Sequence, residues 1–147
     1  MEPVERLFTV AEANALLPKL EEILERLLAL YQEVSKLFSD LNARGIPVRE
    51  EDASPDDPKE IREQRARLRE LASELQEGIA EVNGMGCVLK DIETGLVDFL
   101  SRRGGRTVFL CWRRGEADVA WWHELETGYQ GRRPIGSAED FEGSYLH

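Results

Sequence analysis

The sequence predicts an α+β fold in which a long antiparallel helical hairpin packs on a four-stranded antiparallel β-meander. Residues 9–83 carry apolar side chains at three- and four-residue steps, which is typical of helices with one buried face. A stretch rich in acidic residues and proline, 46–58, divides this region and predicts a mobile loop between two helices. Residues 86–124 change to a period of two with β-branched and aromatic side chains, which is typical of strands. A polar, Gly-rich loop and tail, 125–147, follows them.

The length and the cysteines limit the class of protein. We expect the 147 residues to form one domain, because a chain of this length buries roughly two thirds of its unfolded surface on folding. Cys87 and Cys111 lack CxxC spacing and stand among apolar residues. We therefore expect reduced core thiols and no structural zinc site of a familiar kind.

Charge and hydropathy argue against nucleic-acid and membrane partners. The net charge of -10 repels phosphate backbones, so general nucleic-acid binding is not expected. The first residues are acidic where a signal peptide needs basic ones, and Glu25 and Arg26 interrupt the longest apolar stretch. A membrane span needs about 20 apolar residues. We expect a cytoplasmic protein.

Capping signals predict where the helices begin and end. Thr9 and Glu12 have the spacing of a capping box, and Pro18 predicts a break followed by a longer helix that ends before Gly45. Asp57, which precedes Pro58, is the expected N-cap of the next long helix. That helix is expected to end at Asn83-Gly84.

We expect four strands, at residues 87–92, 96–101, 107–113 and 118–124. Their turns are short, so each strand should pair antiparallel with the next. Two-residue first and second turns, with Arg113 opposite Asp118 across the third, divide the strands into two faces. The predicted core face consists of Val88, Lys90, Ile92, Val97, Phe99, Val108, Leu110, Trp112, Val119, Trp121 and His123. The other, mixed face consists of Leu89, Asp91, Leu96, Asp98, Leu100, Phe109, Cys111, Arg113, Asp118, Ala120, Trp122 and Glu124.

On the mixed face, counting residues places Asp91 opposite Asp98, and facing like charges are destabilising. Four arrangements would relieve this repulsion. The pair could bind a divalent metal, contact an arginine such as Arg113 or Arg132, share a proton, or simply be solvated.

Other candidates for chemistry lie nearby. His123 is not part of an HExxH helix, so it is either a hydrogen-bonded core residue or a general base or ligand. Lys90 is expected to reach the sheet edge or to pair with an acid such as Glu116. Arg132 and Arg133, in a Gly-rich segment, could form an anion-binding nest.

The mixed face also carries a predicted apolar patch that needs a cover. A second copy of the chain would provide one, which predicts a homodimer, and the C-terminal segment is the alternative cover. The patch consists of Leu89, Leu96, Leu100, Phe109, Ala120 and Trp122.

Three segments, FTVAEANALLPKL, NGMGCVLKDIETGLVDF and GRTVFLCWRRGEADVAWWHELETGYQGRRPI, resemble a bacterial family of domains of unknown function. The resemblance covers most of the chain except the linker and the tail. It implies a bacterial cytoplasmic protein and brings no catalytic or binding residue with it.

Two functions fit the sequence. The first is an interaction or oligomerisation module without catalysis, with no cofactor and with a homodimer as its assembly. The second is a small metal- or anion-binding enzyme, such as a hydrolase, with its site on or at the edge of the sheet. The candidate residues of the second are Lys90, Asp91, Asp98, Glu116, His123 and Arg132.

Overall fold

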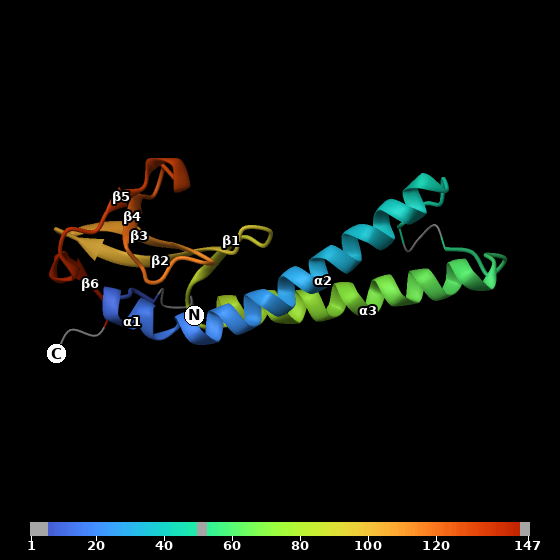
Figure 1. Ribbon diagram of the computed structural model, residues 1–147, viewed down its shortest axis with the longest axis horizontal. Helices are drawn as coiled ribbons and strands as arrows, with labels where there is room; N and C mark the ends of the chain where they lie inside the picture. The colour runs from blue at the N-terminus through green and yellow to red at the C-terminus, as the bar shows by residue number, and fades with distance from the viewer. Residues whose placement is uncertain (1–5, 50–52, 145–147) are drawn as a thin grey trace, which may run out of the picture.

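The computed structural model describes residues 6–49 and 53–144 and has the α+β architecture that the sequence predicts. Three helices, α1 (Val10–Ala15), α2 (Leu17–Ala43) and α3 (Lys59–Gly84), precede the sheet. Figure 1 shows α2 and α3 side by side as a hairpin that extends well beyond the sheet. The predicted mobile loop contains residues 50–52 and the predicted tail contains 145–147, which lie outside the described residues.

Local signals explain how the helices begin. The capping box is confirmed, since Thr9 Oγ1 accepts a hydrogen bond from the Glu12 N–H and Glu12 Oε1 accepts one from the Thr9 N–H. Pro18 lies in the first turn of α2, as predicted. The predicted N-cap at Asp57 is wrong, because Pro58 occupies that position. Asp57 instead pairs, at 3.2 Å, with the buried guanidinium of Arg65 in the second turn of α3.

Among the described residues, the sheet has six strands rather than the predicted four. The strands are β1 (Val88–Asp91), β2 (Leu96–Arg103), β3 (Arg106–Arg113), β4 (Trp121–Glu124), β5 (Arg133–Pro134) and β6 (Phe141–Glu142). They are antiparallel in the order β1-β2-β3-β4-β5, and β6 pairs with the far end of β2. The two extra strands arise because the segment after β4, predicted as a loop and tail, returns to both edges of the sheet.

The predicted register of β2 and β3 is confirmed, with Val97 opposite Trp112 and Phe99 opposite Leu110. The side chains of this face are almost completely buried and join α1 and the first half of α2 in the main core. The hairpin covers this face at its base, and the rest of its length extends beyond the sheet (Figure 1).

The predicted pairing of Asp91 with Asp98 is wrong. The register shifts between Leu89 and Asp91, so that Asp98 lies opposite Val88 and Asp91 lies opposite Leu96. Asp91 Oδ2 accepts hydrogen bonds from the backbone N–H and the hydroxyl of Thr94, at 3.1 and 2.6 Å. These bonds build a turn longer than the two residues predicted, because an aspartate readily bonds to the backbone of the turn that follows it.

The predicted register of β4 is wrong by one residue. Phe109 lies opposite His123 and Leu110 opposite Trp122, so Trp122 belongs to the helix-facing side and His123 to the other side. The segment before β4 is held elsewhere, since the Val119 N–H donates to Asn14 Oδ1 of α1 at 2.8 Å. β4 therefore begins three residues later than predicted, and the apolar patch expected on the mixed face loses Trp122, which is 6% exposed.

Within residues 6–49 and 53–144, none of the helices has the combination of length and hydrophobicity that crossing a lipid bilayer requires.

Candidate metal centre

Three neighbouring strands each contribute one polar side chain to a buried cluster on the face of the sheet away from the core helices. These are Asp98 of β2, Cys111 directly opposite it on β3, and His123 of β4. The residues are 2%, 0% and 2% exposed. His123 Nε2 lies 3.0 Å from Asp98 Oδ2, and one ligand-type atom from each residue lies within 4.8 Å of the others. We call this group the strand cluster.

The hydrogen bonds of His123 determine which ring nitrogen faces the strand cluster. Its Nδ1 lies 2.7 Å from the backbone oxygen of Glu124. A carbonyl oxygen only accepts hydrogen bonds, so Nδ1 carries a hydrogen and donates it. The other ring nitrogen, Nε2, faces Asp98. The other carboxylate oxygen, Asp98 Oδ1, is buried and has no hydrogen-bond partner among the described residues, which is unusual for a buried carboxylate.

The thiol of Cys111 is not arranged as a nucleophile. Burial raises its pKa to about 12, and the negative charge of Asp98 acts in the same direction. Both ring nitrogens of His123 are bonded elsewhere, so neither activates the thiol as a general base would. A cysteine–histidine–aspartate hydrolase site is therefore a poor description of the strand cluster. A bound metal ion would instead hold this sulfur as a thiolate.

Arg132 and Glu116 lie against the same part of β3. The Arg132 guanidinium donates to both carboxylate oxygens of Glu116, at 2.7 and 3.0 Å, and more weakly to the backbone oxygen of Cys111. The rings of Trp121 and Tyr129 lie 5.0 and 4.7 Å from it. Burial has the largest single effect on the pKa of Arg132 and lowers it. The hydrogen bond to Glu116 and the electrostatic effects of Cys111, Glu116 and Tyr129 together outweigh burial and raise the pKa.

The structure thus brings together some of the predicted candidates and separates others. Asp98 and His123 meet in the strand cluster, and Glu116 pairs with Arg132 beside it. Lys90 is exposed and does not pair with Glu116 as suggested, since its Nζ lies 5.0 Å from the ring centroid of Phe109. Asp91 belongs to the turn after β1 and is exposed.

Two backbone N–H groups of the predicted anion-binding nest are engaged within the Gly-rich segment itself. The backbone N–H groups of Gly131 and Arg132 donate to Gly128 and Tyr129 within their own turn. Those N–H groups are therefore not free to bind an anion. Arg133 points to the opposite face of the sheet, where its guanidinium lies over Trp122.

Sequence reasoning missed Cys111 as a possible ligand. Its spacing from Cys87 carries no metal signal, and its apolar neighbours predict an ordinary core thiol. The period-two pattern did place Cys111 on the same face as Asp98, which the structure confirms. The missing information was the register of β4, which moves His123 onto that face.

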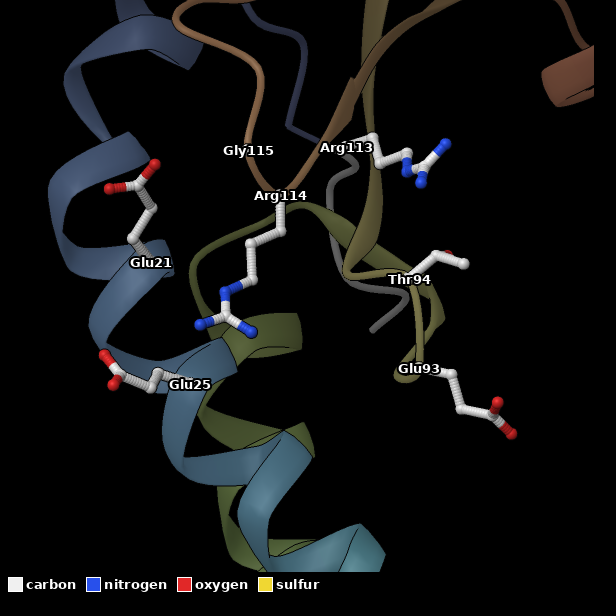
Figure 2. A pocket seen from close by; sticks show the side chains of 7 residues that line it. All are labelled: Glu21, Glu25, Glu93, Thr94, Arg113, Arg114 and Gly115. Carbon is white, nitrogen blue, oxygen red and sulfur yellow. The ribbon is translucent and has the colours of Figure 1, made fainter.

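A separate surface groove of about 580 Å³ lies between α2 and the turns that follow β1 and β3. Figure 2 shows the Arg114 side chain pointing into it, between two glutamates of α2 and the turn that carries Thr94, while Arg113 points away. Its lining is charged and open to solvent, and no residue of the strand cluster belongs to it. The lining residues are Glu21, Glu25, Glu93, Thr94, Arg113, Arg114 and Gly115.

Comparison with known proteins agrees with the resemblance seen in the sequence. The model of the family described as "Uncharacterized conserved protein (DUF2203)" matches residues 6–135. This range contains all three helices, strands β1 to β5 and the whole strand cluster. No curated protein and no solved structure matches the chain. The chain belongs to the DUF2203 family.

Proposed function

We propose that the protein binds a divalent transition metal ion at Asp98, Cys111 and His123. The observation that carries this proposal is the convergence of a carboxylate oxygen, a sulfur and an imidazole nitrogen within 4.8 Å of one another. Three adjacent strands hold these atoms, so the arrangement is rigid. A buried carboxylate oxygen without a partner would gain one on metal binding.

The set of donor atoms favours zinc over the harder cations. Mg²⁺ and Ca²⁺ prefer ligand sets made of oxygen, whereas Zn²⁺ binds thiolate, imidazole and carboxylate together. Three protein ligands leave one position of a tetrahedral site for a water molecule or a substrate. The sequence suggested a divalent metal bound by Asp91 and Asp98. The proposed site keeps Asp98 as a ligand, and Cys111 and His123 take the place of Asp91.

Contacts around the strand cluster support the same assignment. Metal-bound histidines usually donate their other ring N–H to a carbonyl or a carboxylate, which sets the ring orientation. The Nδ1–H of His123 donates to Glu124 in this way. The positive charge of Arg132 lowers the pKa of Cys111, which opposes the effect of burial and favours the thiolate that a metal ion needs.

Metal content of the purified full-length chain tests the proposal. After incubation with Zn²⁺ and removal of free metal, elemental analysis should find about one zinc ion per chain. Cys111→Ala should lose this zinc, whereas Cys87→Ala should keep it, because Cys87 is equally buried but lies outside the cluster. Co²⁺ should produce a thiolate-to-metal absorption band in the wild-type chain and in Cys87→Ala only.

Two results would contradict metal binding at the strand cluster. The first is a natively folded wild-type chain, checked by circular dichroism, that retains neither zinc nor cobalt. The second is equal metal content in the two cysteine variants, which would place the metal elsewhere.

A further inference from the structure

A group of arginines lies on the opposite side of the sheet from the strand cluster, near the turn between β2 and β3. Arg103 and Arg106 face each other directly across that turn. Trp122 of β4 lies opposite Arg133 of β5. Because alternate residues of a strand share a face, these four side chains and Glu124 all project from the helix-facing side.

Trp122 forms the floor of this group. The guanidinium carbons of Arg103 and Arg133 lie 4.6 and 5.4 Å from its ring centroid, and the ring itself is almost fully buried. Arg106 pairs with Glu124 at 3.1 Å. Together they enclose a small cavity of about 80 Å³, which we call the arginine pocket. Its lining residues are Arg103, Arg106, Val108, Trp122, Glu124 and Arg133.

The charges of the arginine pocket do not balance. It contains three guanidinium groups and a single carboxylate, which leaves two positive charges uncompensated. Within the described part of the chain, neither Arg103 nor Arg133 forms an ion pair, whereas Arg106 of the same pocket pairs with Glu124. Facing like charges are destabilising. Such a concentration of positive charge is unexpected in a chain of net charge -10, unless an anion from outside neutralises it.

We propose that the arginine pocket binds a small, doubly charged tetrahedral oxyanion of the phosphate class. A guanidinium that stacks on an aromatic ring still has its N–H groups in its own plane, where they can donate to an anion. Guanidinium groups match the oxygen spacing of phosphate and form short, charge-assisted hydrogen bonds with it. The volume accommodates one phosphate group, so the remainder of any larger phosphate ester lies in solvent.

Isothermal titration of the full-length chain with inorganic phosphate tests this proposal, at neutral pH and at an ionic strength held constant with sodium chloride. We expect saturable binding of one phosphate per chain and weaker binding of acetate, which carries a single charge. Arg133→Gln and Arg103→Gln should each weaken phosphate binding about tenfold or more, because each removes a charged hydrogen-bond donor. Both positions are exposed, so we expect the variants to fold.

Arg102→Gln is the matched control. It removes the same charge one residue away, but Arg102 projects from the other face of β2. Its phosphate affinity should stay within about twofold of the wild type, since an exposed charge on the other face of the sheet acts on the pocket only through screened electrostatics. Titration with glycerol phosphate tests whether the anion is free phosphate or part of a larger molecule. Tighter binding of glycerol phosphate than of inorganic phosphate would show that the pocket binds the head group of a larger ligand.

The absence of saturable phosphate binding would overturn the proposal. Equal losses of affinity in Arg102→Gln and Arg133→Gln would overturn it as well.

Discussion

Asp98 illustrates how one buried side chain depends on its neighbours. Its carboxylate is 2% exposed, and His123 is the hydrogen-bonding partner the structure gives it. Removing a charged group from water is costly unless the group is paired. Sequence reasoning selected Asp98 because residue counting placed it opposite Asp91, and His123 because the only other histidine is the terminal His147. It could not pair them, since nothing local in the sequence connects positions 25 residues apart.

Removing the Asp98 carboxylate should destabilise the protein even without metal. We expect Asp98→Ala to lower the free energy of unfolding in EDTA by about 3 kcal/mol, because it leaves the buried His123 ring without its partner. Asp118→Ala, at an exposed position, should change it by about 0.5 kcal/mol or less. Urea titrations followed by circular dichroism measure both. Similar stabilities for the two variants would show that the Asp98–His123 contact contributes little.

At the scale of single elements, the beginnings of α1 and α2 follow local signals, whereas the registers of β1 and β4 do not. Thr9, Glu12 and Pro18 act within a few residues of one another, so the sequence alone places the beginnings of α1 and α2. The pairing of α2 with α3 depends on a tertiary contact. Gly78 of α3 is buried, and a Cβ atom added there would overlap the side chain of Leu27 of α2.

Gly78 and Gly84 of α3 should therefore respond in opposite ways to alanine. Gly78→Ala should lower the free energy of unfolding by about 1–3 kcal/mol, because the added methyl group either displaces the Leu27 side chain or pushes α2 and α3 apart. Gly84 has no atom within 4 Å of the added position, so Gly84→Ala should leave stability unchanged or raise it by about 0.5 kcal/mol. Chemical denaturation of both variants checks this. A stabilised Gly78→Ala would mean that α2 and α3 lie further apart than the structure indicates.

At the scale of the whole molecule, the hairpin is supported unevenly. Its base joins the sheet in the main core, whereas its far half extends away from it (Figure 1). Leu41 and Ile61 are buried in that far half but lie outside the main core, and Phe38 is 47% exposed. The predicted homodimer, the cytoplasmic location and the organisation as one domain stay predictions.

Hydrogen exchange should reveal this difference along the hairpin. Backbone amides of residues 31–43 and 59–72 should be protected at least about tenfold less than those of 17–30 and 73–84, because local opening there exposes less apolar surface. Mass spectrometry of dilute protein measures the exchange. Equal protection along the hairpin would contradict the prediction. Protection of the far half that increases with protein concentration would support the predicted homodimer instead.

The sequence by itself determined the α+β class, the beginnings of the first two helices and the register of β2 with β3. Caps, prolines, tight turns and periodicity act over a few residues, so they can be recognised without the tertiary structure. The sequence also indicated the membership of the family. Only the tertiary structure decided that Asp91 is separate from Asp98, that His123 joins Cys111, and that the last strands return to both edges of the sheet. The physical reason is the period of two in a strand. A shift of one residue moves every side chain to the opposite face, and long-range contacts such as that between Val119 and Asn14 select the register.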